Sequence, residues 1–352
     1  MRLLICTQAV DTTDPVLGFF HGWIVALAKH AEHVHVVCLK KGEYRLPSNV
    51  SVLSLGKPSV AKAMEGKGSR GILRAKYVWN LFRYIWSLRN DYDSVFVHMN
   101  EEYVLLAGVF WRLLGKRIVL WRNHKKGSWR TRLAARLAHT VCYTSPEAYA
   151  AVFSNAKKMP IGIDTTLFRS VRSQVDPHSI LFLGRLDAVK HPDVFLEALS
   201  LLRKDGTRFT ADVYGDPTPG RESFAKELKE RFSTLQGVTF YPSIQNEAAP
   251  ALYSSHAIYV NLTPSGSFDK TLGEALACGT VVVAANDVLR GVIPNETLVD
   301  ADDPLSTAAG IRAALSMDEK QRTELAQRSR EYVEREHSLA LLTERLLGIF
   351  MA

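Results

Sequence analysis

The fold of the C-terminal half is decided by the stretch Ser179-Ile-Leu-Phe-Leu-Gly-Arg-Leu-Asp-Ala-Val-Lys-His-Pro192. We expect a strand over Ser179–Leu183, because the four residues after Ser179 form an apolar run that is typical of a strand buried on both faces of a parallel sheet. A loop from Gly184 to His191 follows, and Pro192 stands near the first turn of the next helix. Ligands of open α/β sheets bind outside the carboxyl ends of strands, so this loop lies where a bound group would be expected.

The alternation of strand and helix continues on the C-terminal side of this stretch. We expect helices over 192–204, 221–234, 247–254 and 271–278, and strands over 209–214, 238–241, 257–262 and 280–284. Residues 318–348 read as a helical tail with periodic leucines. This alternation predicts a Rossmann-like α/β domain in the C-terminal half.

The N-terminal half shows the same alternation. We expect strands at Arg2–Thr7, Val34–Leu39, Ser94–His98, Arg117–Trp121 and Thr140–Tyr143, and helices over 19–28, 71–89, 102–114 and 129–138. The pattern then starts afresh after Pro160-Ile-Gly-Ile-Asp164. A chain of 352 residues is long enough for two cores. The sequence therefore predicts two Rossmann-like domains, with the boundary near residue 168.

The charge is divided unequally between the halves. The net charge is +8, yet residues 1–170 hold 25 Lys and Arg against 11 Asp and Glu, a balance of +14, which leaves −6 for residues 171–352. The basic half predicts an anionic partner such as a phosphorylated acceptor, a membrane surface or nucleic acid. We expect no nucleic acid, because no recognised nucleic-acid-binding module accompanies the charge.

Basic and aromatic residues alternate over residues 62–89. The cations are Lys62, Lys67, Arg70, Arg74, Lys76, Arg83 and Arg89, and the aromatic residues are Tyr77, Trp79, Phe82, Tyr84 and Trp86. This pattern suits a peripheral contact with an anionic membrane. In the alternative interpretation the aromatic residues face the core and the cations are solvated. No run reaches membrane-spanning length, so we expect a cytoplasmic protein, peripheral at the inner face of the membrane where this contact forms.

Arg185 and Lys190 are the candidate phosphate-binding residues of the loop after Leu183. Arginine can hold phosphate oxygens bidentately, and lysine adds a compact charge that stabilises negative charge on a leaving diphosphate. The alternative interpretation is that both are ordinary solvated loop cations.

A second candidate segment runs from Asn261 to Gly279. Its Ser- and Gly-rich loop suits the presentation of backbone amides to an anion, and a helix follows. We expect Glu274 in the first turn of that helix, where its carboxylate can bind the vicinal hydroxyls of a ribose. Helix capping is the alternative role for Glu274.

Together these segments resemble glycosyltransferase family 4, the retaining GT-B enzymes. The matching pieces are Gly184-Arg185 with Lys190, Val213-Tyr-Gly-Asp216, Leu252-Tyr-Ser-Ser255, Pro264-Ser265 and Glu274-Ala-Leu-Ala-Cys-Gly279. The loop with Gly18, the pair Asn123-His124 and Pro160–Asp164 match more loosely. The resemblance implies the GT-B fold, with two Rossmann-like domains facing across a cleft. It implies an acceptor domain over 1–168 with a returning C-terminal helix near 336–352, and a donor domain over 169–335.

The resemblance also implies an activity. A retaining transferase would move a sugar from a nucleoside diphosphate sugar to the hydroxyl of a glycan or glycolipid acceptor. No cofactor and no metal are expected, because Arg185 and Lys190 would do the work of a divalent ion. The departing phosphate would itself deprotonate the acceptor.

Further site residues follow from the resemblance and from the strand ends. The donor-side candidates are Gly18, Gly184, Ser267, Phe268, Asp269, Lys270, Thr271 and Glu274. His124 would face the reacting sugar as the third catalytic candidate beside Arg185 and Lys190. The acceptor-side candidates His98, Asn100 and His21 lie at or near predicted strand ends.

One position departs from the family pattern. The family usually has two glutamates eight positions apart, and here Gly266 occupies the first of them. The first glutamate commonly touches the donor sugar, so its loss puts those contacts and the activity in doubt. Asp269 and Lys270 could supply replacement contacts, or could be solvated loop charges. Two other readings stay open: a non-catalytic nucleotide-sugar-binding pseudo-transferase, and a GT-B-type nucleotide-sugar epimerase.

Overall fold

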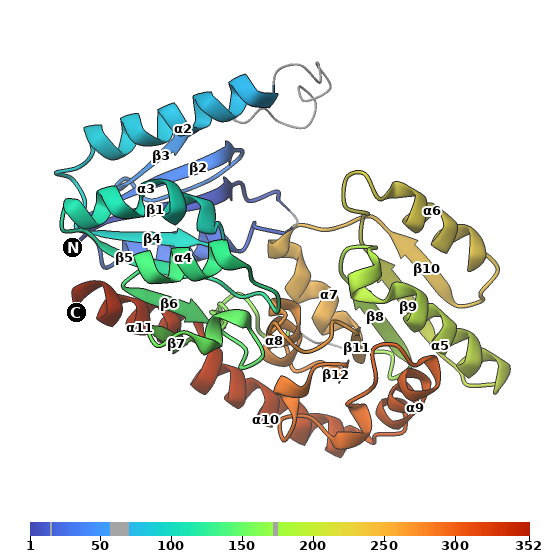
Figure 1. Ribbon diagram of the computed structural model, residues 1–352. Helices are drawn as coiled ribbons and strands as arrows, with labels where there is room; N and C mark the ends of the chain where they lie inside the picture. Colours follow the sequence, from blue (N-terminus) through green and yellow to red (C-terminus); the bar gives the residue numbers. More distant parts are fainter. Residues whose placement is uncertain (15, 57–69, 172–174) are drawn as a thin grey trace. The chain divides into compact units, whose positions relative to one another are not determined.

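The computed structural model describes residues 1–14, 16–56, 70–171 and 175–352 (Figure 1). The chain divides into two compact units. The first comprises Met1–Pro160 and Leu339–Ala352, and the second comprises Ile161–Ser338. Each unit contains one sheet in which all strand pairings given for the described residues are parallel. The predicted α/β class with two Rossmann-like domains is confirmed.

The sheet of the first unit has the strand order β3-β2-β1-β4-β5-β6-β7. Its strands are β1 (Arg2–Val10), β2 (His33–Lys41), β3 (Val50–Ser54), β4 (Ser94–His98), β5 (Arg117–Trp121), β6 (Thr140–Tyr143) and β7 (Ala156–Lys158). The order reverses between β1 and β4, so the topological switch point of this unit lies at the carboxyl ends of these two strands.

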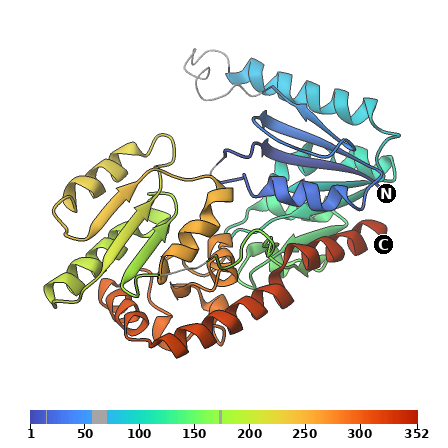
Figure 2. The same cartoon turned by 180° about the vertical axis from the view of Figure 1, so that it is seen from behind.

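Helices cover both faces of this sheet. They are α1 (Phe20–Ala28), α2 (Arg70–Ser87), α3 (Glu101–Leu113), α4 (Trp129–Leu137) and α11 (Leu339–Met351). One core cluster joins the sheet to α2, α3 and α4, and another joins it to α1 and α11. Figure 1 shows the first group on one side of the sheet, and Figure 2 shows α1 and α11 on the other. The short turn η3 (Tyr149–Val152) precedes β7.

The sheet of the second unit has the order β10-β9-β8-β11-β12. Its strands are β8 (Ser179–Leu183), β9 (Thr210–Tyr214), β10 (Val238–Tyr241), β11 (Ile258–Asn261) and β12 (Val281–Ala284). Its helices are α5 (Pro192–Lys204), α6 (Glu222–Arg231), α7 (Ala249–Ser255), α8 (Lys270–Ala277), α9 (Pro304–Leu315) and α10 (Glu319–His337). The order reverses between β8 and β11, which makes the ends of these strands the second switch point.

The chain passes between the units earlier than residue 168. The second unit begins at Ile161, because the side chains of Ile161, Ile163 and Phe168 pack into its core. The helical tail predicted over 318–348 is two helices, since Ser338 is extended and ends α10. The second helix, α11, belongs to the first unit, where Leu342, Leu346 and Phe350 join its core.

Three elements were not predicted. The strands β3 and β7 lie at the two edges of the first sheet, and the partial exposure of edge strands weakens the apolar run by which a strand is recognised. The helix α9 begins at Pro304 after Asp303, which accepts a hydrogen bond from the amide of Leu305 at 2.8 Å. Among the described residues, no helix combines the length and apolar character needed to span a membrane.

Candidate functional site

The switch point of the second unit brings together two loops that are distant in sequence. Lys190 follows β8, whereas Thr263 and Asp269 follow β11. The Lys190 ammonium donates a hydrogen bond to Thr263 Oγ1 at 3.0 Å and forms an ion pair with the Asp269 carboxylate. The neighbouring positions of β8 and β11 in the sheet therefore create a contact that joins two of the predicted site residues.

Local structure positions the Lys190 side chain. A single turn, η4 (Ala188–Lys190), ends at His191, whose backbone is left-handed with φ +48°. Pro192 then opens α5. A methyl group placed at Gly184 would lie 3.9 Å from Cγ and Cδ of Lys190, so the lysine stem passes over this glycine. The Lys190 side chain is only 17% exposed, and the interpretation of this residue as a solvated loop cation is wrong.

Arg185 lies in the same loop in a more open setting. Its Nη1 donates a hydrogen bond to Thr218 Oγ1 at 3.2 Å and lies 3.5 Å from Oδ2 of Asp187. The Thr218 hydroxyl and amide also donate to the buried Asp187 carboxylate. The Arg185 side chain remains 42% exposed. One edge of the guanidinium is thus oriented by Asp187 and Thr218 while much of the side chain stays accessible to an anion.

Asp269 is the centre of a polar network. Its Oδ2 accepts hydrogen bonds from Asn261 Nδ2 at 3.1 Å and from Thr263 Oγ1 at 3.0 Å, besides the ammonium of Lys190. Burial opposes the ionisation of this carboxyl, but the charge of Lys190 and these hydrogen bonds hold its pKa well below the usual range. Asp269 is therefore an ionised internal counter-ion of Lys190 at neutral pH.

The remaining loop residues hold this network in place. The Thr271 hydroxyl lies 2.8 Å from the Tyr259 hydroxyl and 2.9 Å from Asn261 Nδ2. The Ser267 carbonyl accepts a hydrogen bond from Asn286 at 2.9 Å. Phe268 is buried, and its ring meets the His337 ring edge to face at 4.8 Å. Of the predicted donor-side residues in this loop, Phe268 and Thr271 therefore have packing and network roles in the described structure.

Lys270 and Glu274 form a second pair of charges on α8. The Lys270 ammonium donates to the Gly162 carbonyl at 2.7 Å. Burial lowers the pKa of Lys270 to about 8, although Glu274 and Asp164 favour its charged form. Burial likewise raises the pKa of Glu274, against the opposing effect of Lys270. The alternative interpretation of Lys270 as a solvated loop charge is therefore wrong.

The prediction that Glu274 lies in the first turn of its helix is wrong. The helix α8 begins at Lys270, so Glu274 lies in the second turn, and the capping residue is Asp269, which accepts from the Thr271 amide at 3.4 Å. The Glu274 carboxylate accepts instead from Asn246 Nδ2 at 3.2 Å and from the Tyr253 hydroxyl at 3.3 Å. Capping therefore does not account for Glu274.

Glycines shape the strand ends around this network. Gly266 has φ +125°, a conformation that glycine adopts far more readily than other residues. The absence of the family's first glutamate is thus accompanied by a backbone that disfavours a side chain. A methyl group at Gly215, after β9, would lie 1.9 Å from the Gly184 carbonyl oxygen. The loops after β8 and β9 can therefore approach this closely only because residue 215 has no side chain.

The switch point of the first unit also carries polar residues. Gln8 Nε2 donates to Asn100 Oδ1 at 2.5 Å, which links the ends of β1 and β4. Between β4 and Asn100, Met99 has φ +66°, a strained conformation for this residue type. A methyl group at Gly18 would lie 2.8 Å from the Asp14 carbonyl oxygen and 2.9 Å from that of Thr12, so only glycine fits there.

The three histidines proposed for the first unit lie in different environments. His98 is buried and stacks on the Phe20 ring at 4.0 Å, with Thr7 Oγ1 at 3.5 Å from its Nδ1. The His21 Nε2 accepts a hydrogen bond from the Arg45 amide at 3.1 Å. His124 is exposed after β5, and its Nδ1 accepts from the Lys126 amide at 3.0 Å. Of the three, His124 is the exposed one.

Several site residues were not predicted. In the second unit these are Asp187, Asn246, Tyr253, Asn261 and Thr263. Asn261 could have been found, because it is a polar residue that ends an apolar strand.

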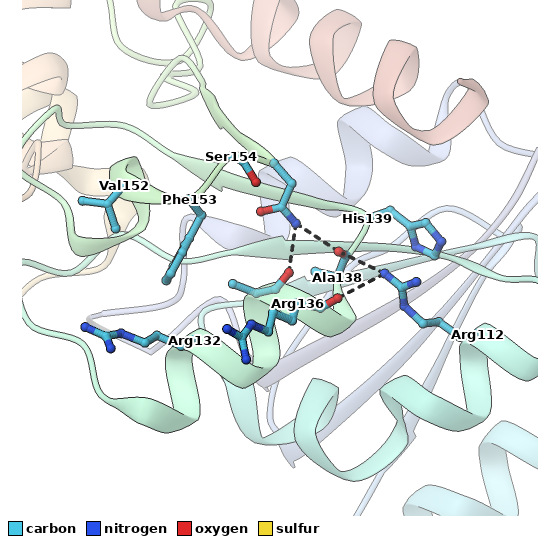
Figure 3. Close-up of a pocket in the computed structure, with 10 residues that line it drawn as sticks. Arg112, Arg132, Arg136, Ala138, His139, Val152, Phe153 and Ser154 are labelled. Carbon is cyan, nitrogen blue, oxygen red and sulfur yellow. Dashed lines mark hydrogen bonds between the residues drawn. The ribbon is translucent and has the colours of Figure 1, made fainter.

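The first unit contains a cavity of about 710 Å³ lined by Arg112, Arg132, Arg136 and His139 among others (Figure 3). This cavity was not predicted from the sequence. The predicted helix over 129–138 could have pointed to an anion-binding surface here, because it contains three arginines and no acidic residue.

Comparison with known proteins places a family match on the second unit. Residues 177–317 match the family model described as "Glycosyl transferases group 1". The D-inositol 3-phosphate glycosyltransferase of Xylanimonas cellulosilytica is 32% identical over 47% of this chain and 42% of its own length. That of Acidothermus cellulolyticus is 29% identical over 47% of this chain and 41% of its own. The chain thus spans less than half the length of these curated relatives.

Solved structures resemble the whole chain. HepE of Anabaena in complex with UDP and glucose superimposes with a TM-score of 0.76 at 16% identity and covers 100% of both chains. Sucrose-phosphate synthase of Thermosynechococcus elongatus gives a TM-score of 0.78 at 19% identity over 99% of this chain and 98% of its own. These likenesses show the GT-B fold.

Proposed function

We propose that this protein is a retaining, metal-independent glycosyltransferase of the family 4 kind. It transfers a sugar from a nucleoside diphosphate sugar to an acceptor hydroxyl in the synthesis of a cell-surface glycan, polysaccharide or glycolipid. The observation that carries this proposal is the position of Arg185 and Lys190 in one loop at the second unit's switch point, within the residues that match the family model. The fold shared with a UDP complex supports a nucleotide donor.

In this proposal the second unit is the donor domain. Arg185 has an accessible guanidinium, which suits bidentate binding of a diphosphate. The ammonium of Lys190 has three donors, of which Thr263 and Asp269 take two, so one is available to a phosphate oxygen. Both cations would stabilise the charge that develops on the leaving diphosphate. Gly184 and the loop Ser267–Thr271 would border the donor.

The first unit is the acceptor domain in this proposal. Asn100 and His124 follow neighbouring strands, β4 and β5, and parallel strands end at one edge of their sheet. We place the acceptor hydroxyl on this edge, with His124 toward the reacting sugar. The leaving phosphate would remove the acceptor proton. A glycolipid acceptor suits a cytoplasmic protein that lies peripherally at the inner face of a membrane.

A panel of nucleoside diphosphate sugars, each incubated with and without acceptor glycans, tests the proposal. We expect release of nucleoside diphosphate that depends on the acceptor, together with a glycosylated product that keeps the donor's anomeric configuration. Epimerised donor without transfer would contradict it. Donor binding without turnover would favour the pseudo-transferase, the reading that the absent carboxylate at Gly266 supports.

Glu274→Gln is expected to weaken the binding of nucleoside diphosphate about tenfold while the melting temperature changes little. Glutamine keeps the size of the side chain, and its amide oxygen can accept from Asn246 Nδ2 while its amide nitrogen donates to the Tyr253 hydroxyl oxygen. It binds ribose hydroxyls less strongly than a carboxylate. Glu274→Ala would leave both partners unpaired, at a cost of about 1–3 kcal/mol, and so would confound stability with binding. Isothermal titration calorimetry with UDP measures the effect, and an unchanged affinity would remove Glu274 from the donor site.

A further inference from the structure

Three helices of the first unit share one outer surface. The inner sides of α2, α3 and α4 pack on the same face of the seven-stranded sheet. Aromatic contacts join two of them, since Phe110 of α3 meets the rings of Phe82 and Trp86 of α2 at 6.4 and 5.8 Å. The helices α3 and α4 are also in contact. The three helices lie on the same side of the sheet (Figure 1), and their outer sides together are called here the outer helical face.

Large apolar side chains are exposed along this face. Trp79 on α2 is 72% exposed, Trp129 at the start of α4 is 70% exposed, and Leu113 on α3 is 81% exposed. Further members at helical spacing are Trp86, Leu106, Val109 and Leu133. All the exposed tryptophans of the described chain lie here, so the aromatic residues of α2 do not all face the core. An apolar surface of this kind on a protein marks an interaction site.

The same face is strongly basic. The exposed cations are Arg74, Lys76 and Arg83 on α2, and Arg130, Arg132 and Arg136 on α4. Neither α2 nor α4 contains an acidic residue. Of the two acidic residues at the start of α3, Glu101 is paired with Arg122 at 3.0 Å and Glu102 is exposed. The guanidinium of Arg89 lies over the Trp86 ring at 4.5 Å. Lys62 and Lys67 of the basic and aromatic pattern lie outside the described residues.

The arginine-lined cavity opens beside α4 (Figure 3). Arg112 is held there by the carbonyls at the end of α4, with 2.7 Å from its Nε to the Leu137 oxygen. Arg132 and Arg136 are four residues apart on α4, where like charges repel, and no carboxylate lines the cavity. The Nε of Arg132 donates a hydrogen bond to the Tyr149 hydroxyl oxygen at 2.8 Å. This arrangement suits an anion with several acceptor oxygens, such as a phosphate group.

We propose that the outer helical face docks on an anionic lipid bilayer, with a lipid phosphate in the arginine-lined cavity. Tryptophan and arginine sit at the boundary between headgroups and acyl chains, and the aliphatic side chains of α3 enter the apolar side of that boundary. Leu106, Val109 and Leu113 neither stack on bases nor bond to phosphates, which favours a bilayer over nucleic acid. The inference does not rest on sugar transfer.

Co-sedimentation of the full chain with vesicles of phosphatidylcholine, with or without phosphatidylglycerol, tests the docking. We expect binding to the anionic vesicles at low ionic strength, a blue shift of tryptophan fluorescence, and little binding to the neutral vesicles. The pair Trp79→Ala/Trp129→Ala and the pair Arg132→Glu/Arg136→Glu should each reduce binding at least tenfold. Arg231→Glu/Leu305→Ala in the second unit is the matched control and should bind like the wild type.

Circular dichroism and melting temperatures establish that each variant is folded. The two tryptophans and two arginines are exposed, so their replacement should leave the fold intact. Failure of the wild type to sediment with anionic vesicles at low ionic strength would overturn the proposal. Equal loss of binding in the control pair would also overturn it. A third outcome would also overturn it: the wild type binds an oligonucleotide but no vesicles, and both the tryptophan pair and the arginine pair of variants lose the binding of the oligonucleotide.

Discussion

Arg185→Ala is expected to reduce turnover by about 10²- to 10³-fold, because a preorganised donor to charge that develops on a leaving group contributes roughly 3–4 kcal/mol in a water-poor site. The stability of the fold should change little. The Arg185 side chain is 42% exposed, and an ion pair with such a partner contributes about 0–1 kcal/mol. The buried Asp187 also keeps the Thr218 amide and hydroxyl as donors. We therefore expect the melting temperature to stay within a few degrees of the wild type.

The matched control is Arg231→Ala. Arg231 is likewise an arginine of the second unit with one ion pair, to Glu197 at 2.6 Å, but it lies on α6 away from the switch point. Steady-state kinetics with the active donor, and thermal unfolding of both variants, make the comparison. If the two variants lose activity to the same extent, Arg185 does not act on the diphosphate, and the main support for the proposed transfer mechanism is lost.

Lys190→Ala is expected to lower the free energy of unfolding by about 3 kcal/mol at neutral pH. Removing one partner of a buried ion pair leaves the other charge uncompensated, which costs roughly 3–5 kcal/mol, and the slight exposure of Asp269 favours the lower end. We therefore expect a large loss of stability on replacement of Lys190 and a small one on replacement of Arg185. Lys226→Ala removes an exposed lysine that is paired with Glu230 at 3.8 Å, and this control should change the unfolding free energy by less than about 1 kcal/mol.

A double variant separates structure from catalysis at Lys190. In Lys190→Met/Asp269→Asn both charges are absent, and asparagine remains a good cap for α8. Its unfolding free energy should return to within about 1–2 kcal/mol of the wild type, whereas transfer activity should stay about 10²-fold lower or more. Recovery of activity together with stability would show that Lys190 serves only the fold. A double variant no more stable than Lys190→Ala would contradict the counter-ion role of Asp269.

The pH dependence of unfolding gives a second measure of the ion pair. The pKa of Asp269 is depressed in the folded state, so the pair contributes fully above the unfolded value of about 3.9. That contribution is lost as the pH falls below about 4 toward the lower folded pKa. The difference in the free energy of unfolding, measured with urea, between the wild type and the Asp269→Asn variant should therefore be constant from pH 5 to 7 and shrink only in acid. If this difference shrinks near pH 6, a titrating group other than Asp269 is responsible for it.

The sequence by itself was sufficient for the strands inside the two sheets and for the loop that holds the site, whereas the edge strands β3 and β7 were not predicted. The bounds of β4, β5, β6 and β8 agree with the predicted strands, because strands inside a parallel sheet are buried on both faces and form apolar runs. The bounds of β10, an edge strand, also agree. The bounds of α5 agree as well, since Pro192 marks its start. Two apolar runs, each followed by polar loops, were enough to place Arg185, Lys190 and the Asp269 loop at the carboxyl ends of strands.

Only the tertiary structure decided how these residues are partnered. Lys190 and Asp269 are 79 residues apart, and they meet because β8 and β11 are neighbours in the sheet, an order that no local pattern encodes. The helix α8 begins at Lys270 because Asp269 caps it, which moves Glu274 to the second turn, where its carboxylate is buried beside Asn246 and Tyr253. Likewise, basic and aromatic residues at helical spacing have the same pattern whether the rings face the core or the solvent. The packing of α2 on the sheet and on Phe110 decides that Leu81 and Ile85 are buried while Trp79 is exposed.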